Sequence, residues 1–264
     1  MLRMYAELIR VRFLMMLAYR VNYYSGILIY SLNIGAYYFL WMAVFSGRES
    51  LQGFVPLQMA TYIAVSWMAR AFYFNNLDRE IAAEIRDGTV AVQLLRPYNY
   101  LLTKVFLGFG EGLFRLLLFS IPGMILVSLV FPISLPTEPI TWAKFALSLL
   151  LGFLVNVEIN LITGLLAFFV LNNAGILRAK RFVVEILSGL IIPISFFPVW
   201  GQVVSQYLPF QAISYLPSVV LVKGLSGQEW IQALLTQGIW VLLLIVPIQL
   251  IWRRARKNLI VQGG

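Results

Sequence analysis

Few side chains in this sequence are suited to chemistry, and the types that are absent restrict its function. The chain contains no histidine and no cysteine, which excludes a Ser-His-Asp triad, a thiol nucleophile, a disulfide and a zinc site built on those ligands. Its only aspartates are Asp78 and Asp87. No glycine is followed by lysine, so the phosphate-binding motif G-x-x-x-x-G-K-[ST] is also absent. If the protein depends on ATP, we expect another chain to bind it.

Three charged residues stand within long apolar stretches. Glu111 and Arg115 are four residues apart, which puts them on one face of a helix where ion pairing offsets part of the desolvation cost. We interpret this pair as structural. Glu158 has no such partner, and a carboxylate inside a membrane is by default a candidate proton, cation or substrate contact. The alternative is that a long helix carries Glu158 towards the membrane surface.

The elements that must position these residues are membrane helices. The chain has 264 residues, 61% of them apolar and 12% charged, with a mean hydropathy of +0.84, whereas soluble domains carry about 25% charged residues. We therefore expect an all-α integral membrane protein with six transmembrane helices, since six spans of about 20 residues fit within this length. Pro122, Gly152 and Gly164 are predicted bend points in the two longest helices. The predicted spans are 26–45, 54–74, 101–131, 142–171, 182–197 and 231–252.

Residues 1–20 differ from these spans because they contain four arginines and no small-residue cleavage site. On a helix, their apolar side chains fall on one stripe and most of the charged ones on the opposite side. We predict an amphipathic interfacial helix at the membrane surface, since a span would bury the arginines. The apolar stripe is Leu2, Tyr5, Ile9, Phe13 and Met16, and the polar side carries Arg3, Glu7 and Arg10.

The lysines and arginines gather in alternate segments. Four lie in the amino-terminal segment, five in 70–104, three in 178–181 and four at the carboxyl terminus, whereas the other loops hold only Arg48, Lys144 and Lys223. This asymmetry predicts that both termini are cytoplasmic, in a multi-pass protein of a bacterial-type cytoplasmic (inner) membrane. The net charge of +9 is therefore an orientation signal. We do not expect nucleic-acid binding, which would require a basic stripe interleaved with exposed aromatic residues.

The most polar internal stretch is 75–99, and we predict a cytoplasmic helical hairpin there. Asn76 can cap its helix, and Gly88 can end that helix in a left-handed conformation. Several apolar residues remain to be covered, which favours docking of a soluble partner. The alternative is a solvated connecting helix. The apolar residues are Ile81, Ile85, Val92 and Leu95.

The hairpin sequence R-E-I-x-x-E-I-R-D-G-T-V-A-V-Q-L-L-R-P-Y-N, at 79–99, resembles that of ABC-2 family permeases, the membrane subunits of type-2 ABC exporters. In that family a coupling helix between the second and third spans sits in a groove of the ATPase. The resemblance implies a single transmembrane domain over 1–264, two copies of an ATP-binding subunit, and an identical or sister permease as dimer partner. It also implies that ATP and Mg bind to the partner, with no cofactor or metal on this chain. The residues implied in ATPase coupling are Asp78, Glu80, Ile81, Glu84, Ile85, Gly88, Leu95 and Pro97.

The segment 198–224 is similar to the external re-entrant helices of the same family. Irregular backbone at membrane depth requires protein or water to satisfy its polar groups, so the prolines here imply a packed or water-lined setting. The resemblance makes this segment a gate that closes the outer mouth, with Pro198, Pro209 and Pro217 as its candidate residues. The alternative is a loop on the outer face.

These features lead us to expect a permease subunit of an ATP-driven exporter, without an ATPase site of its own. The expected substrate is amphipathic, lipid-linked or drug-like and moves outward from the cytoplasm or inner leaflet. Glu111, Arg115 and Glu158 are the charged candidates for its path. The main alternative is a secondary transporter driven by an ion gradient through Glu158. A membrane enzyme and a non-transporting scaffold are further alternatives.

Overall fold

The computed structural model describes residues 2–18, 21–170 and 172–257. The predicted elements 1–20 and 142–171 therefore each include positions outside the described residues. Over the described ranges the structure is 81% helix and has no β-strand. An isolated bridge joins Leu51 and Phe54. The predicted all-α class is confirmed.

The helical elements have the following bounds in chain order. They are α1 (Leu2–Ala18), α2 (Val21–Val44), α3 (Pro56–Tyr73), α4 (Leu77–Arg86), α5 (Thr89–Leu94), α6 (Tyr100–Arg115), η1 (Leu116–Ser120), α7 (Ile121–Val130), α8 (Pro139–Leu165), η2 (Leu166–Phe168), α9 (Ala174–Leu187), η3 (Ile194–Phe196), α10 (Val199–Gln206), η4 (Pro209–Ala212), α11 (Tyr215–Lys223) and α12 (Gly227–Lys257). Element η1 is one π-helical turn, and η2, η3 and η4 are 3-10 turns.

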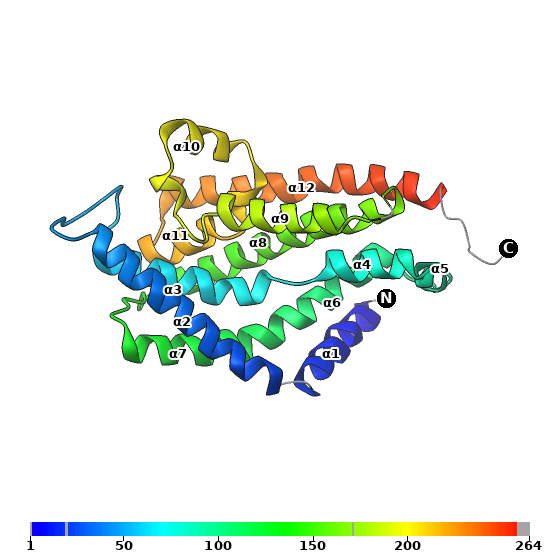
Figure 1. Ribbon diagram of the computed structural model, residues 1–264, viewed down its shortest axis with the longest axis horizontal. Coiled ribbons are helices and arrows are strands. Elements are labelled where there is room, and N and C mark those ends of the chain that lie inside the picture. The colour runs from blue at the N-terminus through cyan, green and yellow to red at the C-terminus, as the bar shows by residue number, and fades with distance from the viewer. Residues whose placement is uncertain (1, 19–20, 171, 258–264) are drawn as a thin grey trace.

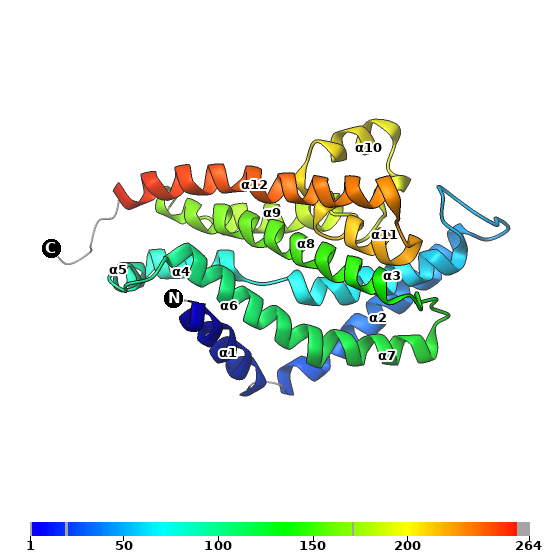
Figure 2. The same ribbon diagram turned by 180° about the vertical axis from the view of Figure 1, so that it is seen from behind.

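The longest helices run side by side along the long axis of the molecule (Figure 1). The α4–α5 hairpin lies at one end, together with the amino end of α1 and the carboxyl end of α12. The loop between α2 and α3, the end of α7, and the segment containing α10 and α11 lie towards the opposite end, as the view from behind also shows (Figure 2). The molecule therefore has two chemically different ends, one of which carries the polar hairpin.

Four helical segments in the described part of the chain are long and apolar enough to cross a membrane: Ser25–Val44, Tyr100–Val130, Pro139–Phe168 and Gly227–Arg256. They overlap the first, third, fourth and sixth predicted spans. Helix α3, which overlaps the second predicted span, is an inner helix with 13 of its 18 residues buried. Because protein rather than lipid surrounds it, α3 can include polar residues such as Thr61 and Ser66. The count of six spans stays a prediction.

The fifth predicted span, 182–197, does not coincide with one helix. Helix α9 begins earlier, at Ala174, and ends at Leu187. The backbone then turns at Gly189, whose φ of 79° lies in the left-handed region. The predicted span began at 182 and excluded the charged residues before it. Lys180 nevertheless lies within α9, where it forms an ion pair with Asp78 that stabilises its charge.

The predicted bend points have different roles. A π-helical turn, η1, directly precedes Pro122 and interrupts the regular helix, as expected where proline removes a hydrogen-bond donor. Helix α8 continues through Gly152 but ends at Leu165, directly after Gly164, where the 3-10 turn η2 follows. These glycines permit close packing: a Cβ atom at Gly152 would lie 2.8 Å from the Ile213 carbonyl oxygen, and one at Gly164 would lie 3.0 Å from the Asp78 carbonyl oxygen.

Helix α1 packs against α6. The rings of Tyr5 and Phe106 stack at 4.6 Å, and those of Phe13 and Phe114 meet edge to face at 5.7 Å. At Gly110 the two backbones approach so closely that a Cβ atom would lie 2.5 Å from the Ile9 carbonyl oxygen. The predicted apolar stripe of α1 therefore covers another helix of the same chain, rather than only the membrane interior.

Candidate functional site

The α4–α5 hairpin is the candidate site, and a glycine forms its turn. Gly88 joins α4 to α5 with a φ of 71°, in the left-handed region, as predicted for the residue that ends α4. Asn76 occupies the position before α4, but its side chain makes no capping hydrogen bond. The Asn75 carboxamide oxygen instead accepts a hydrogen bond from the backbone N–H of Leu77 at 3.3 Å.

Helix α4 is fixed to the membrane helices by its apolar side. Leu77 and Ile81 are 1% and 0% exposed. Ile81 lies directly over Gly164 of α8, where a Cβ atom would be 3.0 Å from the Ile81 Cβ. The expectation that Ile81 remains uncovered is therefore wrong, because α8 already covers it. Ile85 is half-buried and packs beside the same cluster.

The exposed apolar residues of the hairpin lie on α5 and directly after it. Val92 is 58% exposed and Leu95 is 86% exposed, and Pro97 is also at the surface. Large apolar side chains at the tip of a polar hairpin are typical of a protein-binding surface. We name Val92, Leu95 and Pro97 the apolar tip.

Arg12 of α1 joins the hairpin to α6. Its guanidinium forms an ion pair with Glu80 of α4 and another with Glu111 of α6, with a distance of 2.6 Å to the Glu111 Oε2. Glu111 also pairs with Arg115, as their spacing predicted. Arg115 in turn donates a hydrogen bond of 2.6 Å to the Phe74 carbonyl oxygen, at the end of α3. We name Glu80, Arg12, Glu111 and Arg115 the ionic relay.

The electrostatics of the relay keep Arg12 charged. Burial alone would lower the pKa of the Arg12 guanidinium, but the negative charges of Glu111 and Glu80 outweigh burial and raise the pKa above its ordinary value. The Glu111 side chain is only 4% exposed. A carboxylate this buried requires cationic partners, and Arg12 and Arg115 provide them.

A second set of contacts fixes the other side of α4. Glu84 pairs with Lys104 of α6 and accepts a hydrogen bond of 2.7 Å from the Tyr100 hydroxyl. The Tyr100 ring stacks on that of Trp252 in α12 at 5.4 Å. Through Glu84 the hairpin is therefore connected to two long helices.

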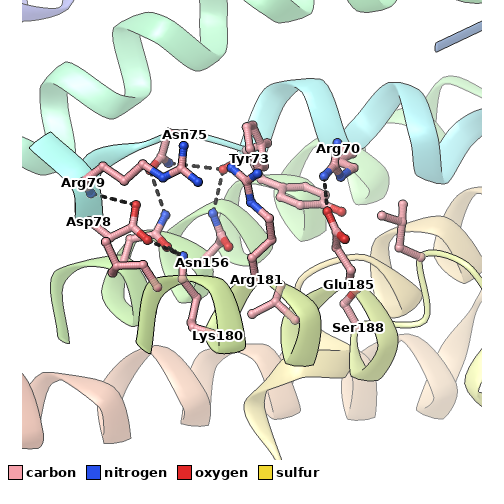
Figure 3. Close-up of a pocket in the computed structure, with 15 residues that line it drawn as sticks. Arg70, Tyr73, Asn75, Asp78, Arg79, Asn156, Lys180, Arg181, Glu185 and Ser188 are labelled. Atoms are coloured by element: carbon pink, nitrogen blue, oxygen red, sulfur yellow. Dashed lines mark hydrogen bonds and ion pairs between the residues drawn. The ribbon is translucent and has the colours of Figure 1, made fainter. Parts of the chain in front are cut away.

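The third set of contacts surrounds a small polar pocket between the start of α4, α8 and α9 (Figure 3). Asp78 is 4% exposed and forms an ion pair of 2.7 Å with Lys180. Asn160 donates to the Asn75 carboxamide oxygen at 2.8 Å, and Asn156 donates to the Tyr73 carbonyl oxygen at 2.7 Å.

Glu158 lies apart from these networks. It is 8% exposed, and its Oε2 atom has no hydrogen-bond partner among the described residues. Neighbouring residues of the same chain therefore enclose Glu158, and its depth in the membrane stays a prediction. Glu111 and Arg115 form part of the relay, so the structure does not bring the three predicted path residues into one charged site.

The predicted gate residues belong to a packed irregular segment. Pro198 is exposed at the start of α10, Pro209 is half-buried and Pro217 is buried in α11. Two hydrogen bonds connect polar backbone groups of this segment to other parts of the chain. Gln237 of α12 donates to the Ala212 carbonyl oxygen at 2.8 Å, and the backbone N–H of Tyr215 donates to the Ser188 carbonyl oxygen at 2.9 Å. The packed setting predicted from the prolines is present here.

A model for the family described as "ABC-2 family transporter protein" matches residues 31–263. The chain belongs to the ABC-2 family. This membership confirms the resemblance noted at 79–99 and makes the chain a multi-pass membrane protein and an ABC permease subunit. A search of curated proteins found no match.

ABC-2 family permeases are transport subunits that are generally not catalytic themselves, and they generally work with an ATP-binding subunit in the membrane. The apolar tip lies within the matched residues, whereas Arg12 lies before them. The apolar tip therefore lies in the part of the chain that matches the family, and its anchor on α1 lies before that part.

Sequence analysis missed Arg12 and the pocket cations as site residues. Arg12 follows Tyr5 by seven residues, which on an α-helix places the two about 20° apart. It therefore lies within the apolar stripe of α1, and an arginine on an apolar stripe signals a buried charged partner. Nothing in the local sequence indicated that Lys180 would meet Asp78.

Proposed function

We propose that this ABC-2 family chain is the membrane-spanning half of an ATP-driven exporter. It would pair with an identical or sister permease and with two copies of an ATP-binding subunit, which would hold ATP and Mg. Its substrate would be amphipathic, lipid-linked or drug-like and would move outward from the cytoplasm or inner leaflet. The observation that carries this proposal is the apolar tip on a hairpin that is itself anchored to the membrane helices.

The anchors give the hairpin the properties of a lever. The apolar tip is exposed and available to a partner, whereas Ile81 fixes α4 to α8 and the ionic relay fixes it to α1 and α6. Movement of an ATPase bound at the tip would therefore be transmitted to several membrane helices together. For ATP to drive the change, the ATPase must bind the two conformations of the permease with different free energies.

The proposed topology has six spans and cytoplasmic termini in a bacterial-type inner membrane. Two observations support it. The amino end of α1 and the carboxyl end of α12 lie at the same end of the molecule as the hairpin, and the basic residues concentrate in the segments assigned to that end. The two spans beyond the four strongly apolar ones would be α3 and the segment that begins with α9.

Co-purification from native membranes in mild detergent tests the proposed partner, with mass identification and an ATPase assay. We expect an ATP-binding subunit in stoichiometric amount. Leu95→Glu places a carboxylate in the contact, so the retained subunit should fall at least about tenfold, as for a central interface residue. Leu95→Met keeps an apolar side chain and is the matched control. A chain that purifies alone under conditions preserving other membrane complexes, or a Leu95→Glu variant that keeps its partner, would contradict the proposal.

A second candidate function is favoured by one observation, the unpartnered buried oxygen of Glu158. Such a carboxylate could bind a proton or cation in a gradient-driven secondary transporter. Glu158→Gln keeps the shape of the side chain and removes its charge. Under this alternative the variant loses transport that depends on an ion gradient, whereas full transport by the variant excludes Glu158 from the mechanism.

A further inference from the structure

The polar pocket beside the hairpin has more cations than carboxylates. Arg70, Arg79, Lys180 and Arg181 line it, together with the carboxylates of Asp78 and Glu185. Arg70 pairs with Glu185 and Lys180 pairs with Asp78. Among the residues described, no carboxylate pairs with Arg79 or Arg181. The pocket thus carries two guanidinium groups whose charge the protein does not neutralise.

These two arginines differ in burial, because Arg181 is half-buried and Arg79 is exposed. Figure 3 shows Arg79 and Arg181 extending into the space between the two ion pairs. The Arg181 guanidinium lies 5.1 Å from the centre of the Phe74 ring, and the Arg70 guanidinium lies 4.6 Å from the same ring. Like charges held this close around one partly buried ring repel each other. An anion bound to Arg181 would offset the repulsion between the Arg70 and Arg181 guanidinium groups.

Both asparagine side chains that line the pocket, Asn156 and Asn160, are already hydrogen-bonded to the protein. Asn156 donates to the Tyr73 carbonyl oxygen, and the Asn160 side chain bonds both Asn75 and Lys180. The donors left for a ligand include the guanidinium N–H groups of Arg79 and Arg181, which suit oxygen anions. The Ser188 hydroxyl also lines the pocket and has no hydrogen-bond partner among the described residues. The cavity volume of about 30 Å³ holds about two water-sized atoms. A ligand would therefore place one or two oxygens inside and keep its remaining atoms at the mouth.

We propose that this pocket binds a phosphate monoester between Arg79 and Arg181. A phosphate monoester carries about −1.5 to −2 charges at pH 7, which matches the two unneutralised guanidinium groups. Its oxygens accept the paired N–H donors of a guanidinium in a bidentate fashion, a geometry that a lysine ammonium does not offer. The phosphate can belong to the headgroup of a membrane lipid or to a soluble metabolite, and the chemistry recognised is the same.

Binding is measured on the full-length chain purified in detergent, by native mass spectrometry at increasing concentrations of phosphatidic acid, with phosphatidylcholine as the uncharged comparison. We expect phosphatidic acid to bind more tightly. Arg79→Gln and Arg181→Gln should each raise its Kd at least about tenfold, because each removes charge-assisted hydrogen bonds. Arg86→Gln on α4 and Arg178→Gln on α9 are the matched controls, since both arginines are exposed and outside the pocket. Their Kd values should stay within about twofold of the unmodified chain.

Glycerol 3-phosphate, a soluble monoester, distinguishes the two sources of phosphate. If it displaces phosphatidic acid, the phosphate alone is recognised. If it does not, the ligand is a lipid headgroup, and the proposal also stands. Equal binding of phosphatidic acid and phosphatidylcholine, or equal loss in all four variants, would overturn it. Arg79 is exposed, so Arg79→Gln tests the site even where Arg181→Gln fails to fold. No ATP-binding subunit is present, so the result is independent of the exporter proposal.

Discussion

Arg12 is the residue on which contacts between three helices converge. Its guanidinium pairs with Glu80 of α4 and Glu111 of α6, although it belongs to α1. Arg10, two residues earlier and on the polar side of the same helix, pairs among the described residues only with Glu7, and both of those side chains are largely exposed. The two arginines therefore provide a comparison between a buried and a surface ion pair within one helix.

Arg12→Gln should destabilise the protein, whereas Arg10→Gln should not. The change leaves Glu111 buried with Arg115 as its remaining partner, so we expect a loss of about 1.5–3 kcal/mol, the range for one hydrogen bond to a charged group. A surface pair such as Arg10–Glu7 contributes about 0–1 kcal/mol. Thermal unfolding of the detergent-solubilised variants measures both. Equal unfolding temperatures for the two variants would show that the ionic relay does not stabilise the fold.

The relay also shows how far residue patterns could be read from the sequence. The Glu111–Arg115 pair follows from a spacing of four within one helix, and the structure forms it. The partners of Arg12 are 68 and 99 residues away, so no local pattern specifies them. The position of Arg12 on an apolar stripe indicated that it needed a partner, but not which one.

At the scale of elements, α4 and α8 contact each other through a glycine. Gly164 of α8 lies beneath α4, where a Cβ atom would be 3.0 Å from both the Asp78 carbonyl oxygen and the Ile81 Cβ. The sequence predicted a bend at this position, because glycine within a helix is a common site of bending. The role of Gly164 in the structure depends on α4, which is far away in the sequence. The early start of α9 also depends on α4, because Asp78 of α4 pairs with Lys180 of α9.

Gly164→Ala should therefore separate α4 from α8. Alanine favours a helix over glycine by about 1 kcal/mol, but overpacking at a close contact costs about 1–3 kcal/mol, so we expect a net loss of stability. Gly238→Ala is the matched control, because a Cβ atom there meets nothing within 4 Å in α12. It should be neutral or stabilising. Thermal unfolding compares the two, and a Gly164→Ala variant as stable as Gly238→Ala would contradict the close packing.

At the scale of the whole molecule, hydropathy clearly identified the membrane helices that face lipid. The hydropathy signal was weaker for helices that are surrounded by other helices of the protein. Four segments are apolar enough to be recognised from composition and length. Helix α3 is enclosed by its neighbours, and two of the charged residues of α9, Lys180 and Glu185, form ion pairs with neighbouring elements. The number of crossings therefore depends on these two segments, for which tertiary contacts replace the hydrophobic signal.

The absence of cysteine from the sequence makes the crossings directly measurable, because any introduced thiol is the only one. Ser50, Thr89, Thr137, Gly175 and Ser226 are exposed: 50, 137 and 226 lie between helices, whereas 89 and 175 lie at the starts of α5 and α9. With six spans, a membrane-impermeant thiol reagent applied to intact cells should label single-cysteine variants at 50, 137 and 226. Variants at 89 and 175 should react only after the membrane is permeabilised.

Each pair of neighbouring positions tests one crossing. Opposite labelling of 50 and 89 means that α3 crosses the membrane, and opposite labelling of 175 and 226 means that the segment from α9 to α11 does. If only the four strongly apolar segments cross, then 50 and 89 will react alike, and so will 175 and 226. Labelling of 89 from outside would place the hairpin away from cytoplasmic ATP, and an ATPase could then not dock on the apolar tip. The same five variants therefore test the span count and the orientation on which the exporter proposal depends.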